Sequence, residues 1–308
     1  MRSGEEPVQG GPRKDVVRLR LGFSSEDFGY SISLGLPSET GSAFSLDPEI
    51  KRECIWAGPH FRPASLLVDR KGPLVRVRSE RSWDVVSQSA SAFSSMFDNV
   101  VDPSSAPELF HMRAAIRNWR FYDHFRTDKD APARKAQLGS RTPVLHHDGR
   151  DLAAALQTIL EIGDSAALTE TIGDAFPGAE LEILRHEDGR FSIRFSQDGL
   201  LRALSGAELS DGTLRYILWV TALLTPRPPP LMVLNEPETS LHPDLLPALA
   251  RLILRVSERT QVWVVSHATG LISALGEHPE CRELEKNLGQ TKIVGQGPLD
   301  APAWHWPD

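Results

Sequence analysis

The sequence is poor in cysteine and has no long apolar run. Its 308 residues include two cysteines, Cys54 and Cys281, which lie far apart and outside any Cys-x-x-Cys spacing. A disulfide framework is therefore not expected, and a reducing compartment fits better. No segment reaches the about 18 apolar residues of a membrane span, and the polar start MRSGEEPVQGGPRKD lacks a signal-peptide core. We expect a cytoplasmic protein with no membrane contact.

The sequence also lacks an excess of positive charge. Lysine and arginine number 34 against 41 aspartates and glutamates, which gives a net charge of −7. A surface that coats nucleic acid without sequence preference is therefore not expected, although a local basic groove is compatible with this balance. The chain is 40% hydrophobic and 24% charged, which is ordinary for a globular protein with one large domain or two modest ones.

Residues 15–105 show the pattern of an antiparallel β subdomain. Apolar and polar residues alternate in VVRLRLGF (residues 16–23) and YSISLGL (residues 30–36), as in half-buried strands. The segment SLLVDRKGPLVRVRSE predicts a hairpin with its turn at residues 69–72. A flexible segment, residues 1–14, is expected to precede this subdomain.

A helical insertion with a hairpin is predicted over residues 106–200. The segment PELFHMRAAIRNWRFYDHF (residues 107–125) begins with proline and spaces its apolar residues as in a helix. A second helix follows DGRD, with Asp151 as its expected N-cap. The EDGR turn at residues 187–190 predicts the hairpin.

Residues 201–297 show the strand–helix alternation of an α/β domain. We predict, in order, a helix over residues 210–224, a strand over residues 231–235, a helix from Pro243, a strand over residues 261–266 and a helix from Thr269. Both strands are continuously apolar, as is typical of parallel strands that are covered on both faces. An irregular tail, residues 298–308, is expected after this domain.

The first motif is LMVLNEPE, an apolar strand that ends in Asn235 and Glu236. Ligands of open α/β sheets bind outside the carboxyl ends of the strands. The usual motif there is an aspartate that orients Mg²⁺ and a glutamate that polarises the attacking water. Glu236 can serve as the base, whereas Asn235 is uncharged and can hold Mg²⁺ only weakly, through a water. The alternative is a buried strand with a polar end and a helix-capping loop.

Two further motifs are LSDGTLR and VWVVSHA. Ser210 can offer its hydroxyl and a free N–H at a helix N-terminus, which favours an anion, and Gly212 allows close backbone approach. An ordinary N-cap formed by Ser210 or Asp211 is the alternative.

His267 follows an apolar strand, as Glu236 does, so both should project at the same sheet edge. There His267 could hydrogen-bond a γ-phosphate or the attacking water, although a structural histidine is the usual finding.

With SLHP after Glu236, these motifs resemble the signature, Walker B, D-loop and H-loop of ABC-type ATPases, in the right order. The segments NEPETSLHPD and GRDLAAALQ are similar to those of the RecF/SMC-like bacterial AAA ATPases. The resemblance implies an α/β P-loop NTPase fold of the ABC/SMC-head type. An antiparallel β subdomain, a helical insertion and a mainly parallel C-terminal sheet would compose it.

The resemblance also implies roles for single residues. By position, Glu236 would be the catalytic base, His267 the γ-phosphate sensor and Asn235 the weak Mg²⁺-shell residue. The signature and D-loop residues, which would contact a nucleotide bound by a second head, are Ser210, Asp211, Gly212 and Ser240. The implied cofactors are ATP and Mg²⁺, and the implied partner is a second ATPase head, either a copy of this chain or an intact paralogue.

One motif of this family is missing from the sequence. The chain has no Gly-Lys pair, so it lacks the GxxxxGK[ST] phosphate loop (Walker A), whose amides and lysine hold the phosphates. We interpret the chain as an N-terminally truncated member or a degenerate paralogue. In the family the phosphate-loop strand lies beside the H-loop strand, so VWVVS should have an unpaired apolar edge that is open to pairing with another chain.

Two functions remain open at this stage. The first is ATP binding and hydrolysis by a head that works as a nucleotide-sandwiched dimer, with this chain alone impaired by the missing phosphate loop. The second is a pseudo-ATPase or remnant that acts by protein–protein interaction.

A nuclease of the OLD type would need a Toprim-like domain, for which the residues after 275 are too few. DNA contact through Arg113, Arg117 and Arg120 is a weaker expectation than a solvated basic face.

Overall fold

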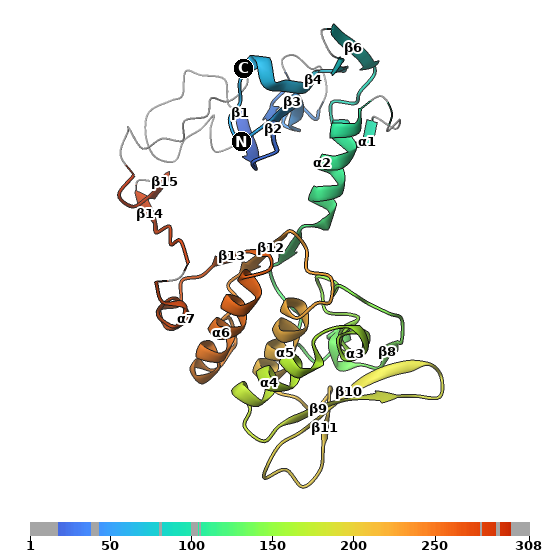
Figure 1. Ribbon diagram of the computed structural model, residues 1–308, viewed down its shortest axis with the longest axis vertical. Helices are drawn as coiled ribbons and strands as arrows, with labels where there is room; N and C mark the ends of the chain where they lie inside the picture. The colour runs from blue at the N-terminus through green and yellow to red at the C-terminus, as the bar shows by residue number, and fades with distance from the viewer. Residues whose placement is uncertain are drawn as a thin grey trace. The chain divides into compact units, whose positions relative to one another are not determined.

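The structure is a computed structural model that describes residues 18–37, 43–79, 82–99, 104, 106–277, 279–287 and 290–296. The chain forms two compact units, Met1–Arg117 with Cys281–Asp308, and Asn118–Glu280. Figure 1 shows the described elements of both. The segments expected to be flexible (residues 1–14) and irregular (residues 298–308) lie outside the described residues.

The first unit is built on a six-stranded antiparallel sheet, in which strands that are neighbours in the sequence pair with each other. The strands are β1 (Arg18–Ser24), β2 (Phe28–Gly35), β3 (Glu49–Ala57), β4 (Leu66–Lys71), β5 (Leu74–Ser79) and β6 (Ser82–Ser87). The other elements are the 3₁₀ turn η2 (Pro63–Ser65), helices α1 (Met96–Asn99) and α2 (Pro107–Asn118), and the hairpin of β14 (Leu284–Asn287) and β15 (Gln290–Ile293). The antiparallel sheet predicted from the alternating pattern is therefore present.

The turn between β4 and β5 lies later in the chain than predicted. Lys71 pairs with Leu74, and Gly72 has a φ of 58°, so the chain reverses after Lys71 and not over residues 69–72. Asp69 remains in the strand because its buried carboxylate accepts hydrogen bonds from Arg52 and Arg76. Two ion pairs thus retain in the strand a residue that is typical of turns.

A buried ion pair joins the sheet of the first unit to the segment that follows it. Glu53 and Arg70 have fully buried side chains, and the distance from Arg70 Nη1 to Glu53 Oε2 is 2.6 Å. The Glu53 carboxylate accepts three more hydrogen bonds, from Tyr30 Oη, Ser95 Oγ and the Met96 N–H. Arg70 also donates to three carbonyls, those of Gly72, Ser91 and Ser94. These hydrogen bonds offset the free-energy cost of burying the two side chains.

The second unit combines a parallel sheet, a small antiparallel sheet and five helices among its described residues. The parallel sheet has the order β13 (Gln261–Val265), β12 (Leu231–Asn235), β7 (Arg120–Tyr122). The antiparallel sheet contains β8 (Gln137–Leu138), β9 (Glu180–Arg185), β10 (Arg190–Ser196) and β11 (Leu204–Ser205). The helices are α3 (Leu152–Ile162), α4 (Ser165–Ala175), α5 (Asp211–Leu223), α6 (Leu246–Ser257) and α7 (Thr269–Leu275), with 3₁₀ turns η3 (Pro132–Arg134) and η4 (Pro243–Leu245).

The single helix predicted over residues 107–125 is wrong in its second part. Helix α2 ends at Asn118, and the aromatic-rich segment Arg120–Tyr122 forms β7, which pairs in parallel with β12. Tyr122 is 1% exposed and donates its hydroxyl to the carbonyl of Leu145. Burial against β12 and this hydrogen bond override the helical spacing of the sequence. Arg120 is therefore not on the same helical face as the two arginines before it.

The second unit has one continuous hydrophobic core, to which α3, α4, α5, α6 and the strands contribute. Helix α5 is buried on all sides from Leu214 to Leu223, so it is the central element of this core. The predicted helical insertion (residues 106–200) does not form a unit of its own. Most of it shares this core with the α/β segment, because α3 and α4 pack against α5 and α6.

The two faces of the parallel sheet differ in burial. On one face Met232 and Leu234 are fully buried. On the other, Phe121 and Trp263 flank Val233 in register and are 58% and 55% exposed. The expectation that both strands are covered on both faces is therefore wrong for β13 among the described residues. As expected, β13 is an edge strand of this sheet as the structure describes it.

The two cysteines are free, as the composition suggested: Cys54 is buried and Cys281 is exposed. Burial raises the pKa of the Cys54 thiol to about 11, which keeps it protonated and unreactive at neutral pH. Among the residues that the structure describes, no helix is long and apolar enough to pass through a bilayer.

We predict that Glu53→Ala strongly destabilises the first unit. The change leaves the Arg70 charge buried without its partner, so the free energy of unfolding should fall by about 3–5 kcal/mol, measured by urea unfolding. Glu49→Ala is the matched control. It removes a partly exposed ion pair with Lys51, and it should cost less than about 1 kcal/mol. Equal losses in the two variants would contradict the prediction.

Candidate functional site

The carboxyl ends of the three parallel strands meet at one edge of the sheet in the second unit. β7, β12 and β13 end at Tyr122, Asn235 and Val265. Because parallel strands end at the same edge, the polar residues that follow them come together. The backbone N–H of Glu236, the residue after β12, donates to the carbonyl of Val265 at 2.7 Å. This edge is the candidate site.

The loop after β12 has an unusual backbone. Glu236 and Ser240 have φ values of 45° and 63°, and they are the only described residues other than glycine with positive φ. Side chains disfavour this conformation, and such outliers cluster at functional sites. Two hydrogen bonds hold the loop, from the Thr239 N–H to the carbonyl of Glu236 and from the Leu241 N–H to the carbonyl of Glu238, both 3.0 Å long. The turn leaves the Glu236 side chain 48% exposed.

The two residues expected to project at this edge lie close together. The distance from His267 Nδ1 to Glu236 Oε1 is 3.6 Å, and the His267 side chain is 77% exposed. A carboxylate and an imidazole that are both open to solvent can bind or exchange a proton with a ligand or a water. Their catalytic roles stay a prediction.

Sequence reasoning gave no role to Asp123, which also lies at this edge. The amide Nδ2 of Asn235 donates to Asp123 Oδ1 at 2.6 Å. Asp123 directly follows β7, so it was missed when residues 107–125 were predicted to be one helix. A signal was present: in RFYD two aromatic residues precede an acid, and in LMVLNE an apolar run also leads to an acid.

Glu238 was also missed, and it differs from Glu236 in burial. Its side chain is 8% exposed. Its Oε1 accepts hydrogen bonds from Ser266 Oγ at 2.7 Å and from the His267 N–H at 3.3 Å. The loop after β12 is thereby tied to the segment after β13.

The signature-like segment begins helix α5. Ser210 is the N-cap, with its Oγ accepting from the Thr213 N–H at 3.1 Å, so the capping interpretation of Ser210 is confirmed. A Cβ on Gly212 would lie 3.0 Å from the carbonyl oxygen of Ser240. A side chain there would press on the loop that carries Glu236, so glycine allows the two segments to approach closely.

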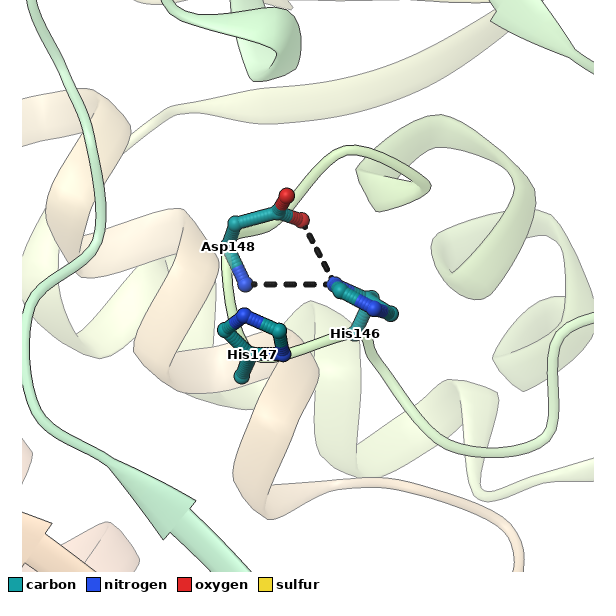
Figure 2. A group of neighbouring side chains, drawn as sticks. All are labelled: His146, His147 and Asp148. Carbon is teal, nitrogen blue, oxygen red and sulfur yellow. Dashed lines mark hydrogen bonds and ion pairs between the residues drawn. The ribbon is translucent and has the colours of Figure 1, made fainter. Parts of the chain in front are cut away.

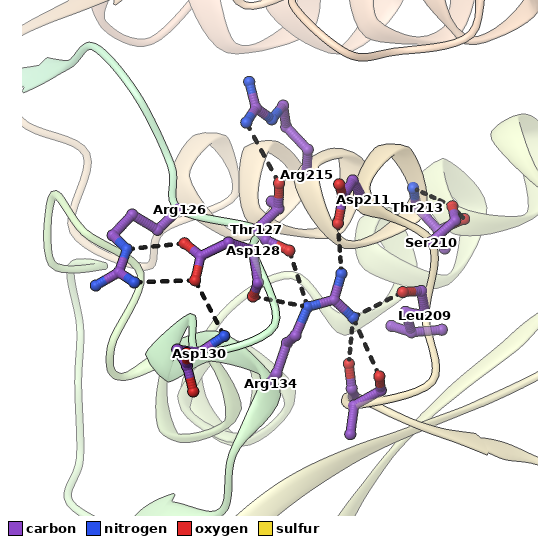
Figure 3. Close-up of polar contacts among 12 residues, drawn as sticks. Arg126, Thr127, Asp128, Asp130, Arg134, Leu209, Ser210, Asp211, Thr213 and Arg215 are labelled. Carbon is purple, nitrogen blue, oxygen red and sulfur yellow. Dashed lines mark hydrogen bonds and ion pairs between the residues drawn. The ribbon is translucent and has the colours of Figure 1, made fainter.

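Arg134 organises the backbone just before α5. Its side chain is 6% exposed, and Figure 3 shows the guanidinium group surrounded by acceptors. It donates to five carbonyls and one carboxylate, those of Thr127, Asp128, Gly206, Ala207, Leu209 and Asp211. A planar fork can satisfy several acceptors at fixed angles, which a lysine cannot do. The predicted site residue Asp211 is therefore held by Arg134.

Arg215 links α5 to two other segments of the site. It is 5% exposed and donates to the carbonyls of Thr239 and Phe125 at 3.1 and 3.0 Å. Thr239 lies in the loop after β12, and Phe125 follows Asp123. Burial lowers the pKa of Arg215, but its normal value is so high that the group stays charged at neutral pH.

His146, His147 and Asp148 are neighbours in the loop before α3, and residues of these types can bind a metal ion. Figure 2 shows that His146 Nδ1 points to Asp148, at 2.7 Å. Arg150 Nη2 also lies 2.6 Å from His146 Nε2, so a cation already occupies the space beside the ring. Asp151, the expected N-cap of α3, makes no side-chain cap and accepts from the His146 N–H instead. These contacts favour a structural loop over a metal centre.

We predict that Arg134→Met disorders the start of α5. Six acceptors lose their donor, so the free energy of unfolding should fall by roughly 3 kcal/mol. Hydrogen exchange should rise in residues 204–211. The control is Arg126→Met, since Arg126 is 54% exposed and pairs with an exposed aspartate, and it should change neither quantity measurably. Unchanged exchange in the Arg134 variant would contradict this role.

Several solved structures are similar to this chain at low sequence identity. An SMC head bound to the C-winged helix domain of ScpA is 12% identical, with 87% of this chain and 74% of that chain covered and a TM-score of 0.46. An SMC head with an extended coiled coil from Pyrococcus furiosus is 10% identical, with 87% and 77% covered and a TM-score of 0.43. The SMC head domain from Thermotoga maritima is 15% identical, with 79% and 74% covered and a TM-score of 0.38. No curated protein matches the chain.

A family model matches the chain over residues 9–273. This match includes most of both units and all the site residues discussed above. The AAA-type family predicted from the motif order is therefore confirmed. The chain belongs to the family described as "AAA domain, putative AbiEii toxin, Type IV TA system".

Proposed function

We propose that the chain is an ATPase head that hydrolyses ATP at a site completed by a second head. The observation that carries this proposal is the 3.6 Å approach of Glu236 and His267 at the carboxyl edge of a parallel sheet. A carboxylate and an imidazole at this edge can together activate and orient a water for attack on a phosphoryl group. Membership of the AAA-domain family supports the same activity.

In this proposal Glu236 takes the proton from the attacking water, and His267 hydrogen-bonds the γ-phosphate or that water. Both side chains are more than one-third exposed, so a ligand and its water can reach them. The positive φ of Glu236 is consistent with a residue whose backbone conformation is dictated by function.

The residues at the sheet edge also fit Mg²⁺. Mg²⁺ prefers oxygen ligands and usually binds through one or two carboxylates, waters and substrate phosphates. Asp123 offers a carboxylate, and the hydrogen bond from Asn235 to Asp123 uses the amide nitrogen, so the amide oxygen remains for a metal-bound water. When bound, Mg²⁺ would neutralise charge on the β- and γ-phosphates. Asp123 would supply the negative charge that Asn235 lacks.

The remaining phosphate contacts require groups beyond the residues of this sequence. The sequence contains no Gly-Lys pair, so a GxxxxGK[ST] loop is not among its residues. We therefore propose that a second head shares the nucleotide. An intact paralogue would supply the loop, whereas a copy of this chain would supply only its signature segment. The residues proposed to face a nucleotide held by that head are Ser210, Asp211, Gly212 and Ser240.

Glu236→Gln should abolish most ATP turnover and leave ATP binding unchanged. The amide keeps the shape of the side chain but cannot accept the proton, so we expect a loss of roughly 10²–10⁴-fold in kcat. Phosphate release and nucleotide binding should be measured with the chain alone and mixed with an intact paralogue, over a range of protein concentrations that includes dimer formation. Glu187→Gln, in the exposed turn between β9 and β10, is the control. Equal turnover in both variants would exclude Glu236 as the base.

A charge exchange between Asp123 and Asn235 tests the Mg²⁺ assignment. Asp123→Asn alone removes the negative charge of the Asp123 carboxylate, and we expect Mg²⁺ affinity to fall by at least about tenfold. Adding Asn235→Asp restores one acid and one amide with the same hydrogen bond, so the double variant should regain affinity to within about threefold of the wild type. Calorimetric titration with Mg²⁺ measures both variants. An Asp123→Asn variant with unchanged Mg²⁺ affinity would contradict the assignment.

A second candidate function is binding without hydrolysis. Phe121, Val233 and Trp263 form an in-register row across the sheet, and the two aromatic side chains are more than half exposed. Exposed apolar side chains beside an edge strand are typical of a surface that pairs with another chain. If the wild type binds no ATP and shows no turnover at any protein concentration, either alone or mixed with an intact paralogue, this second function is favoured.

A further inference from the structure

We propose that Glu238 is a positioning residue, which holds the backbone of His267 so that the imidazole lies beside Glu236. This inference deepens the proposed function and rests on it. Glu238 follows Glu236 by one proline in NEPE, yet the two carboxylates have different surroundings. The side chain of Glu236 is 48% exposed, whereas that of Glu238 is 8% exposed.

The hydrogen bonds of Glu238 go to the segment after β13. Its Oε1 accepts from Ser266 Oγ at 2.7 Å and from the backbone N–H of His267 at 3.3 Å. Ser266 Oγ accepts in turn from the N–H of Ala268, which is the N-cap residue of α7. One carboxylate oxygen therefore anchors the chain on both sides of the His267 Cα.

The placement of the imidazole follows from this anchoring. His267 Nδ1 lies 3.6 Å from Glu236 Oε1 and 4.0 Å from Glu238 Oε1. The His267 ring is 77% exposed, so the backbone bond to Glu238 fixes the His267 Cα and thereby the region that the ring can reach. A displacement of about 1 Å between catalytic groups can cost on the order of 100-fold in rate.

The surroundings of the second carboxylate oxygen show that the buried position of Glu238 costs free energy of folding. Glu238 Oε2 is buried, and no hydrogen-bond partner lies near it in the part of the chain that the structure describes. A buried, unsatisfied carboxylate oxygen opposes folding. An amide oxygen could accept the same two bonds, and the amide group carries no charge. These two bonds need only an acceptor, which makes glutamine the informative replacement.

The test compares Glu238→Gln with Glu238→Ala in the full chain. Glutamine keeps an acceptor for Ser266 Oγ and the His267 N–H, and alanine removes it. Hydrogen exchange of the backbone amides in residues 266–268 should rise at least about tenfold in the alanine variant and remain near wild type in the glutamine variant. The kcat for ATP should fall by roughly 10- to 100-fold in the alanine variant, with KM changed less than about threefold, and the glutamine variant should retain most activity.

Ser266→Ala provides a second route if the Glu238→Ala variant does not fold. It removes one donor to Oε1 and leaves the carboxylate in place, so exchange in residues 266–268 should rise and kcat should fall in the same direction. Glu258→Ala, at the exposed C-terminal end of α6, is the control and should change neither. Wild-type exchange in both Glu238→Ala and Ser266→Ala would overturn the inference, as would equal loss of activity in the glutamine and alanine variants.

Failure of the inference and failure of the proposed function give different results. If the wild type neither binds nor hydrolyses ATP, either alone or mixed with an intact paralogue, the proposed function fails, while the exchange measurement still reports whether Glu238 holds residues 266–268. If the wild type hydrolyses ATP but the Glu238 and Ser266 variants exchange and turn over normally, only the positioning role fails.

Discussion

The candidate site depends on one constraint, the parallel pairing of β7, β12 and β13. Backbone hydrogen bonds bring the ends of three strands, far apart in the sequence, to one edge of the sheet. Asn235 is the last residue of β12, and the residues that follow the three ends are Asp123, Glu236, and Ser266 with His267. Because the strands run in the same direction, each polar residue leaves the sheet on the same side. The pairing of main chains, more than any single side-chain contact, determines which groups can meet.

Two buried arginines extend this arrangement to the start of α5. Arg134 holds the backbone that precedes the helix, and Arg215 joins the helix to the loop after β12 and to the segment after β7. Gly212 lies against the carbonyl of Ser240. The helix start, the loop with positive φ values and the segment after β7 are thus joined in one network of contacts.

The charges of the site are distributed in a way that a motif alone does not reveal. The β12 strand ends in an amide where an acid is usual, and the neighbouring strand contributes an acid within hydrogen-bond distance of that amide. Glu236 and Glu238 belong to the same motif, but burial separates their chemistry: one carboxylate is open to ligands and the other is used by the protein itself. Identical side chains thus take different roles because the loop turns one outward and the other inward.

The sequence by itself determined the antiparallel sheet, the strand ending in Asn235, the capped start of α5 and the membership of an AAA-type family. The sheet, the strand and the helix start follow from periodicity and capping chemistry, which are local properties. The family follows from the resemblance of several motifs in order along the chain. Only the tertiary structure decided that Arg120–Tyr122 is a strand, that Asp69 stays out of the turn, and that Asp123 and Glu238 join the site. In each case a partner distant in the sequence supplies the deciding hydrogen bond or buried surface. A local sequence pattern does not identify such a partner, because the contact between the two residues, and the free energy that it contributes, forms only when the chain folds.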